Sequence, residues 1–427
     1  MGAGVSGKDG VPRAAPVVTG LGVVAPNGIG AAAYWAATLR GESGIAPITR
    51  FDPSGYRVRV AGQTEIRAGE RLPGRLLPQT DRMTRLALVA AEEALADAGA
   101  QDLPDFAAGV VTAASGGGFE FGQRELEALW SKGGAYVSAY QSFAWFYPVN
   151  TGQISIRHGL RGPGSALVSE QAGGLDAVAK ARRHLRGDAS LMLAGGVDGS
   201  LCPWSLLCVT RSGRVSERAD PRRAYLPFDR YARGWVPGEG GALLVLEDPG
   251  AARERGAPQV YGEIAGYAAT FDPRPGSGRP PGLRRAIEGA LADAGAGAGE
   301  VGVVFADAAG TPGADRAEAE ALAEVFGPRG VPVTAPKTMT GRLLGGGASL
   351  DLAAALLTLR DGLIPPTVNV TRPAYPRLID LVLGAPRPAR PACALVVARG
   401  HGGFNSAVVV RGPGGGPRGD REDAKAA

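Results

Sequence analysis

The chain is poor in the residues that form disulfides and metal sites. It has three cysteines and three histidines among 427 residues. Cys202, Cys208 and Cys393 form no CxxC pair and are too few for a disulfide framework, which indicates buried thiols in a reducing, cytoplasmic setting. The histidines lie too far apart in the sequence for a metal site. We therefore expect no metal and no cofactor.

Long hydrophobic runs and basic blocks are also absent from the sequence. No apolar stretch approaches the ~18 residues of a membrane span, so we expect no membrane partner. The net charge is +5, and no Lys/Arg cluster is interleaved with aromatics, so we expect no nucleic acid. This mildly basic balance suits an acidic protein partner. Residues 1–15 and 412–427 are predicted to be a disordered leader and tail, and the leader has no apolar segment typical of a signal peptide.

What the chain does contain is an internal duplication. The sequence ALADAGA occurs at 94–100 and again at 290–296, and each copy is followed by a similar apolar stretch, GVVTAASG at 109–116 and GVVFADAAG at 302–310. A second pair agrees in order, because helical patterns at 171–185 and 341–360 are followed by strands at 190–197 and 392–398. We predict an α/β fold of two halves, residues 16–250 and 251–411.

The stretch 168–177 is predicted to be an elbow between a strand and a helix. Residues 165–168 are short and apolar and predict a buried strand, and helical spacing follows. Acyl-transfer enzymes place a nucleophile at such an elbow, beside exposed backbone N–H groups. The residue at the apex is Gln171, whose carboxamide is not a nucleophile. The elbow thus has the shape for acyl chemistry without the attacking atom.

Five further motifs occur in the order found in ketosynthases of the thiolase fold. They are VVTGLGVVAPNG at 17–28, LPFD at 226–229, GWVPGEGG at 234–241, KTMTG at 337–341 and GGFNS at 402–406. The chain resembles this family from about residue 16 to 411. The resemblance implies an α-β-α-β-α layered, thiolase-like fold with two pseudo-symmetric halves.

The resemblance also assigns three catalytic positions, a cysteine and two histidines, and none is intact. Gln171 stands at the cysteine position, and Ala309 and Arg342 stand at the histidine positions. The family's lysine remains as Lys337. Because all three catalytic side chains are missing together, we expect a subunit that no longer condenses anything. Arg342 is expected to pair with a carboxylate in the stretch 307–318, since a buried unpaired guanidinium is costly.

Three segments narrow the resemblance to one subfamily. SEQAGGLDA at 169–177, VFADAAG at 304–310 and TGRL at 340–343 are similar to the chain-length factor, the ketosynthase β-subunit of bacterial type II aromatic polyketide synthases. In that family the subunit forms a heterodimer with an active ketosynthase α-subunit. Polyketide and malonyl groups reach the complex on an acyl carrier protein. The resemblance therefore implies both proteins as partners.

The family match also points to residues that limit chain length. Phe119, Gly122 and Leu126 recur at the spacing of one helix face, with Phe143 predicted opposite, and the match makes them tunnel residues. Gly122 has no side chain, and Leu126 is smaller than the Phe of shorter-chain relatives, so the resemblance implies a long product, roughly ten or more ketide units. The alternative is that these residues are ordinary core or interface positions.

Gln171 admits two interpretations. Its amide could be a structural plug that hydrogen-bonds across the site, or it could assist malonyl decarboxylation to make an acetyl starter. The second would make the chain a malonyl-acyl-carrier-protein decarboxylase, but Ala309 supplies no donor to a developing enolate. A homodimeric interaction protein without a tunnel is a third hypothesis.

Overall fold

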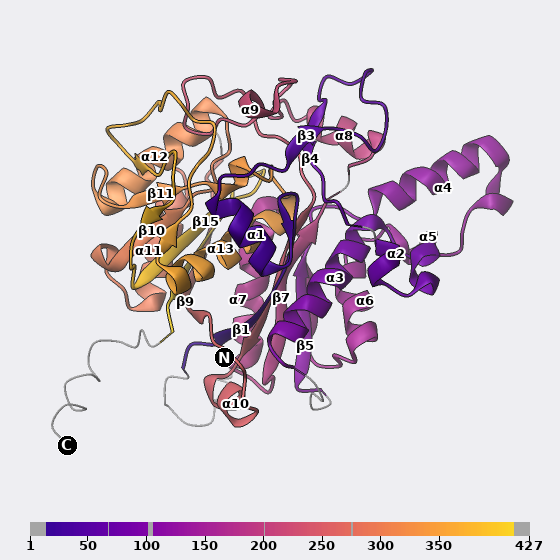
Figure 1. The fold of residues 1–427 in the computed structure, drawn as a ribbon, viewed down its shortest axis with the longest axis horizontal. Coiled ribbons are helices and arrows are strands. Elements are labelled where there is room, and N and C mark those ends of the chain that lie inside the picture. Colours follow the sequence, from indigo (N-terminus) through magenta and orange to yellow (C-terminus); the bar gives the residue numbers. More distant parts are fainter. Residues whose placement is uncertain (1–13, 67, 101–105, 200, 275, 414–427) are drawn as a thin grey trace.

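The computed structural model describes residues 14–66, 68–100, 106–199, 201–274 and 276–413. The predicted leader and tail lie outside these ranges except for their inner ends. Within them the chain forms a large central sheet with helices on both faces (Figure 1). No helix in the described ranges is long and apolar enough to cross a membrane.

The sheet confirms the predicted duplication. Its strands follow the order β13-β11-β10-β15-β16-β9-β1-β8-β7-β5-β6, so the two halves meet at β1 and β9 and mirror each other outward. In each half the second strand from the centre pairs antiparallel with the third. The third strand then pairs parallel with the fourth, and in the first half the fourth pairs parallel with the fifth. The first half contains β1 (Val17–Ala25), β5 (Ala108–Ala113), β6 (Gly164–Leu167), β7 (Leu191–Asp198) and β8 (Gly240–Glu247). The second contains β9 (Gly262–Phe271), β10 (Val301–Phe305), β11 (Pro332–Thr334), β13 (Asp380–Leu381), β15 (Cys393–Arg399) and β16 (Phe404–Arg411).

The repeated ALADAGA sequence ends equivalent helices, α3 (Arg82–Asp97) and α11 (Leu283–Ala294). Each packs closely on the first strand of its half because a glycine in that strand leaves room for the helix backbone. A Cβ at Gly22 would lie 1.8 Å from the Ala90 carbonyl oxygen, and one at Gly266 would lie 2.2 Å from that of Ala290. The duplication therefore extends to the packing of helix on sheet.

Two buried helices form the middle layer. They are α7 (Gly173–Leu185) and α13 (Gly347–Asp361), which contact each other, and α13 contacts strands of both halves. Helix α13 begins six residues later than the expected 341, because residues 341–346 form tight turns against the sheet. We call Gln171, Ala309 and Arg342 the triplet. Helix α7 begins two residues after Gln171 and α13 begins five residues after Arg342, so the middle layer positions these two members.

The elbow strand differs from the sequence expectation. The predicted strand at 165–168 is β6, which is only partly buried, because β6 is the edge of the sheet and pairs with β5 alone. Val168, just beyond it, is 49% exposed. An edge strand of this kind leaves one row of backbone groups unpaired in the isolated chain.

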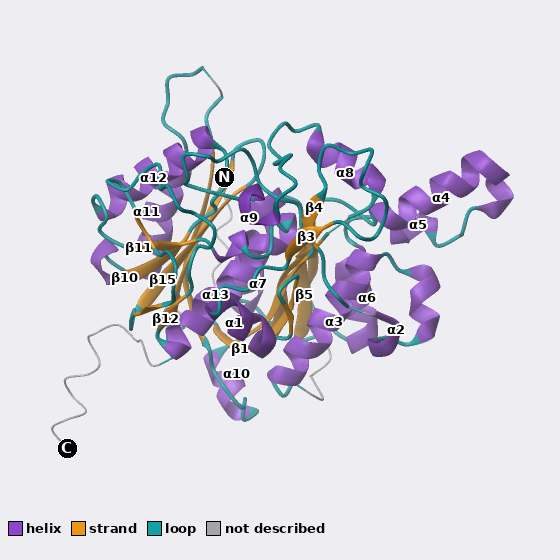
Figure 2. Ribbon diagram, turned by 45° about the horizontal axis from the view of Figure 1, so that its top comes forward, coloured by secondary structure: helices purple, strands orange, loops and turns teal. Residues whose placement is uncertain are grey.

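One helix stands apart from the layered body. Helix α4 (Phe119–Lys132) and the segment through α5 (Gln141–Ala144) project from the first half (Figures 1 and 2). The remaining elements surround the layers: β2 (Gly28–Ile29), α1 (Ala31–Leu39), β3 (Ile45–Pro47), β4 (Val60–Gly62), α2 (Ala68–Arg71), α6 (Val149–His158), α8 (Pro203–Thr210), α9 (Pro221–Ala224), α10 (Pro249–Glu254), α12 (Pro312–Phe326), β12 (Leu363–Ile364) and β14 (Arg387–Pro388).

Candidate functional site

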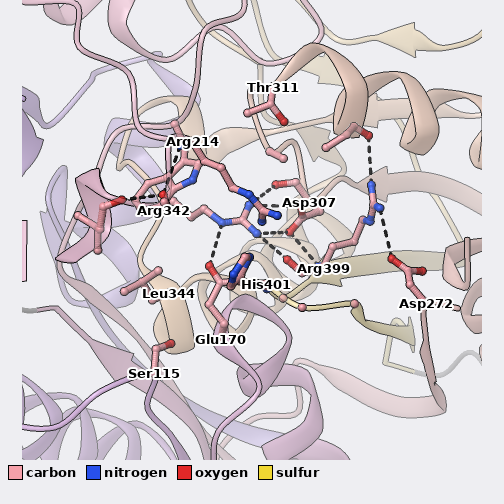
Figure 3. A pocket seen from close by; sticks show the side chains of 18 residues that line it. Ser115, Glu170, Arg214, Asp272, Asp307, Thr311, Arg342, Leu344, Arg399 and His401 are labelled. Carbon is pink, nitrogen blue, oxygen red and sulfur yellow. Dashed lines mark hydrogen bonds and ion pairs between the residues drawn. The ribbon is translucent and has the colours of Figure 1, made fainter. Parts of the chain in front are cut away.

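The fold brings the triplet Gln171, Ala309 and Arg342 together at the ends of three buried elements. Gln171 lies in a 3-10 turn between β6 and α7, Ala309 follows β10, and Arg342 precedes α13. Ala309 and Arg342 line a cavity of about 470 Å³ that opens to the surface (Figure 3). Gln171 is not part of its lining.

Gln171 is fully buried behind the cavity. Its amide packs against the backbone at the start of α13, where a Cβ on Gly347 would lie 2.2 Å from the Gln171 Nε2 atom. Within the described chain neither amide atom has a hydrogen-bond partner. Within the described chain, Gln171 therefore contributes by filling the space that the glycine leaves, and its role as a plug stays a prediction.

Arg342 forms the buried ion pair that the sequence led us to expect. Its Nη2 lies 3.0 Å from Asp307 Oδ1, its Nη1 lies 3.2 Å from Asp307 Oδ2, and Nη2 also donates to the Arg399 carbonyl. Its Nε faces Glu170 at 3.7 Å (Figure 3). Burial opposes the charge, but the carboxylates of Asp307 and Glu170 outweigh it and raise the pKa of the guanidinium.

Buried carboxylates hold the loop that carries Ala309. Glu318 accepts hydrogen bonds from the backbone N–H groups of Asp307 (2.7 Å) and Ala308 (2.9 Å), and Asp315 accepts one from Gly310 (2.8 Å). Burial raises the pKa of both carboxyl groups to about 7, and neighbouring negative charge adds to it. The loop is therefore fixed by residues that lie outside it in the sequence.

Lys337 is also held inside the chain. Its Nζ lies 2.6 Å from Asp351 Oδ2 and donates to the carbonyl of Ala306. Burial raises the pKa of Asp351 to about 6, although Lys337 opposes the shift. The lysine thus links α13 to the end of β10.

Three residues beside the triplet have strained backbones. Glu170, Ala308 and Leu344 have φ values of 50°, 51° and 49°, in the left-handed region that favours glycine. Each such residue costs about 1–3 kcal/mol and persists only where the surroundings determine it. These conformations cluster at functional sites, and nothing in the residue types predicted them.

The structure brings two of the four predicted tunnel residues together. The rings of Phe119 and Trp204 lie edge to face with centroids 4.9 Å apart, and a Cβ on Gly122 would lie 3.3 Å from the same Trp204 ring. Trp204 on α8 was not expected from the sequence. Its ring fills the space beside Gly122 in this chain.

The other two predicted tunnel residues lie elsewhere. Leu126 is 37% exposed on the projecting part of α4. Phe143 packs on a small cluster of Met83, Ala114 and Val149 rather than opposite Gly122. The assignment of these four residues to one tunnel stays a prediction.

The fold and these loops have counterparts among known proteins. Residues 15–251 match the N-terminal domain of β-ketoacyl synthases, and residues 261–371 match their C-terminal domain. The tetracenomycin polyketide synthase ketoacyl synthase beta subunit of Streptomyces glaucescens is 64% identical over 92% of this chain and 98% of its own length. The actinorhodin polyketide putative beta-ketoacyl synthase 2 of Streptomyces coelicolor is 59% identical over 92% and 98%.

A solved structure agrees. The ishigamide ketosynthase/chain length factor superposes with a TM-score of 0.86 at 27% identity, covering 94% of this chain and all of that one. Fold and sequence thus define a β-ketoacyl synthase of the thiolase-like type. Within that class, the chain belongs to the ketosynthase β subunits, or chain-length factors, of bacterial type II polyketide synthases.

Proposed function

We propose that this chain is a non-catalytic subunit that shapes the polyketide tunnel of a cytoplasmic type II ketosynthase. It pairs with an active ketosynthase α-subunit, which receives its substrates from an acyl carrier protein. The observation that carries this proposal is the state of the triplet. Gln171 is buried and unreactive, Ala309 has no polar atom, and Arg342 is engaged by Asp307. None of the three can attack an acyl group or transfer a proton near neutral pH.

The exposed apolar surface of the isolated chain supports the proposal of a permanent partner subunit. The segment of α4, α5 and the residues between and after them exposes seven large apolar side chains, which we call the aromatic arm: Leu126, Trp130, Tyr136, Tyr140, Trp145, Phe146 and Tyr147. An exposed apolar surface of this kind is typical of obligate interfaces. Relatives of both types exist in one organism, since the tetracenomycin ketoacyl synthase alpha subunit of Streptomyces glaucescens is 35% identical to this chain.

A second structural relative supports the proposal that an acyl carrier protein is a partner. The structure named AntDE:AntF, a type II PKS acyl-carrier protein in complex with its ketosynthase bound to the hexaketide, superposes with a TM-score of 0.84 at 27% identity. For this chain we propose that Phe119, Gly122 and Leu126 face the polyketide when the α-subunit covers α4. The small side chains at 122 and 126 favour a long product, roughly ten or more ketide units.

Reconstitution of the chain with an active ketosynthase α-subunit and an acyl carrier protein tests the proposed tunnel residues. Leu126→Phe adds an aromatic ring at an exposed position, so the fold tolerates it, and we expect the main product to shorten by at least one ketide unit. Ala128→Phe makes a similar addition on the opposite face of α4 and is expected to leave the length unchanged. Product masses give the answer. A parent-length product from Leu126→Phe would place the gate elsewhere.

The decarboxylase alternative is tested with the same proteins. It requires a substrate at Gln171, whose side chain is buried outside the cavity. We therefore expect no acetyl-carrier protein from malonyl-carrier protein and this chain alone. Acetyl-carrier formation that disappears in Gln171→Ala would contradict a non-catalytic role.

A further inference from the structure

One buried carboxylate, Asp81, holds the first turns of two helices at once. The residue is only 2% exposed. Its Oδ1 accepts the backbone N–H of Met83 at 2.8 Å, which is the usual contact of an N-cap residue, here that of α3. Its Oδ2 accepts the backbone N–H of Phe121 at 2.8 Å, forty residues further along the chain in α4. A single side chain therefore joins α3 to the helix that carries the proposed tunnel residues.

Helix α4 cannot supply this cap itself. The residue before it is Gly118, which has no side chain, and a Cβ there would lie 2.3 Å from the carbonyl oxygen of Ala144. The usual capping residues therefore do not fit at this position. The first backbone N–H groups of a helix have no partner within the helix, and Phe121 is 1% exposed, so water does not satisfy its N–H group. Asp81 provides from α3 the acceptor that α4 lacks.

The groups around this contact are firmly anchored. Next to Asp81, Arg82 donates two hydrogen bonds of 2.9 Å to the fully buried carboxylate of Glu239. At the other end of the glycine loop that leads into α4, the backbone N–H of Ser115 donates to the buried Asp198 at 2.6 Å. The loop before α4 therefore runs between two fixed carboxylates, and its exit into the helix is set by Asp81.

The direction of α4 depends on this first turn. The elements that α4 packs on most extensively are short, namely α5, α8 and the turn at residues 134–136, and the helix extends away from the layered body (Figure 2). Gly122 directly follows Phe121, and Leu126 lies about 7.5 Å beyond Phe121 at about 1.5 Å per residue. A tilt of about 10° at the first turn would therefore move Leu126 by about 1.3 Å.

Both oxygens of Asp81 are needed as acceptors. Burial raises the pKa of its carboxyl group to about 6, while the N–H groups of Phe121 and Met83 oppose the shift. The group is therefore ionised near neutral pH, and an ionised carboxylate accepts hydrogen bonds at each oxygen. An asparagine in its place has one oxygen that accepts and an NH₂ group that only donates, so it serves one of the two helices in this geometry.

We propose that Asp81 is a positioning residue for chain length, which sets the direction of α4 by capping it from α3. The proposal rests on the proposed function, which places the tunnel residues on α4. Asp81 does not touch the polyketide. It acts through Gly122 and Leu126, because the setting of the first turn decides how far each of them reaches into the tunnel.

Asp81→Asn separates the two caps. Asparagine is as good an N-cap as aspartate, so α3 keeps its cap, while the amide NH₂ faces the N–H of Phe121. Hydrogen exchange of the reconstituted heterodimer, followed by mass spectrometry, should become at least about fivefold faster in residues 119–126, the factor that corresponds to the ~1 kcal/mol of a lost N-cap. Exchange in residues 82–97 of α3 should stay parental. Parental exchange in residues 119–126 overturns the proposal.

The products give a second measurement, which a purely structural role would not change. Because α4 then takes more than one setting, we expect polyketides that differ from the main product by one or more ketide units to become at least about threefold more abundant. Asp81→Ser also caps α3 through a single oxygen and should act in the same way, so the test remains open if one variant assembles poorly. A parental product distribution from a variant with loosened α4 overturns the proposal.

A matched control is available at another helix. Asp248 is the N-cap of α10 and accepts the N–H groups of Gly250 and Ala251, both in its own helix. Helix α10 lies far from α4 (Figure 1). Asp248→Asn should therefore leave both the exchange of residues 119–126 and the product distribution parental. Equal changes in the control and in Asp81→Asn would show a general loss of stability and overturn the proposal.

The role of Asp81 and the proposed tunnel can fail separately. If Leu126→Phe shortens the product while Asp81→Asn loosens α4 without changing the product distribution, only the positioning role of Asp81 is removed. If neither variant changes the product, the gate does not lie on α4, and the proposed tunnel function fails together with the role of Asp81.

Discussion

The region around the triplet and the aromatic arm differ in how far they are exposed to solvent. Around the triplet, Arg342, Asp307 and Glu318 are buried and satisfied by groups of the same chain. On the arm, Trp130 is 83% exposed and Tyr136 is 65% exposed, and Figure 1 shows α4 standing clear of the layered body. Apart from Gln171, the charged groups of the triplet region are satisfied within the chain, whereas the proposed function requires another protein to cover the arm.

The comparison shows that the shape of a site does not depend on its reactive side chains. The loop of Ala309 is held by Glu318 and Asp315 on α12, and the elbow keeps a strained Glu170 beside Gln171. These supports lie outside the triplet, so the three reactive groups can be absent while the loops keep their geometry. In the proposed function, the subunit acts through the aromatic arm on its outer surface.

The largest effect is expected from breaking the ion pair of the triplet region. Arg342→Ala leaves Asp307 buried without its partner, and we expect about 3–5 kcal/mol lower unfolding free energy because an uncompensated buried charge is costly. Denaturant unfolding of the purified heterodimer measures it.

An exposed pair on α12 provides the control. Arg316 pairs with Glu320 at 2.8 Å on the solvent-exposed side of α12, so Arg316→Ala should change the stability little. Equal losses for the two variants would mean that the Arg342 pair is no better sheltered from water than a surface pair.

The sequence was sufficient for the architecture of both regions. Repeated ALADAGA segments, ordered ketosynthase motifs and the helical period at 119–130 predicted the halves, the triplet and the helix of the arm. The pairing of Arg342 with the stretch 307–318 followed from the family match, which places both at one site, and from the cost of burying an unpaired charge. These features depend on sequence motifs, on local periodicity, or on the cost of burying an unpaired charge.

Other features depend on contacts between segments far apart in the chain. The position of Trp204 beside Gly122 brings α8 against α4 and leaves no trace in either local pattern. The partial exposure of β6 follows from its place at the sheet edge, which an apolar run cannot reveal. The close packing of the Gln171 amide against Gly347 brings the elbow against the start of α13, a contact that neither local pattern reveals.

A charge on the aromatic arm should have the next largest effect. Trp130→Asp places a carboxylate in the proposed interface with the α-subunit, and we expect the heterodimer to weaken by at least about 2 kcal/mol, or roughly thirtyfold in Kd. Sedimentation of the co-expressed subunits measures it. Val260→Asp changes a 38% exposed apolar residue away from the arm and should leave assembly intact. Parental assembly of Trp130→Asp would show that this part of the arm stays uncovered.

The smallest effect is expected in the pH dependence of stability that Glu318, beside the triplet, contributes. Burial raises the pKa of Glu318 to about 7 in the folded chain, above its ordinary value of 4.5. The folded protein therefore keeps this proton over a pH range in which the unfolded chain has released it. The resulting stability is fully present below about pH 4.5 and is lost as the pH rises through about 7. We expect the free energy of unfolding to fall between about pH 5 and pH 8.

Glu318→Gln isolates this contribution, because the amide does not titrate. The stability of the variant should fall less than that of the parent between about pH 5 and pH 8, because the variant lacks the group that loses its proton. Burial lowers the pKa of His158 and His184, and this acts in the opposite direction, so the test is the difference between variant and parent curves. Glu320→Gln, two residues along on the exposed face of α12, should keep the parental slope. If Glu318→Gln keeps that slope as well, the carboxyl is ionised throughout, and water must then reach the triplet region more freely than its burial indicates.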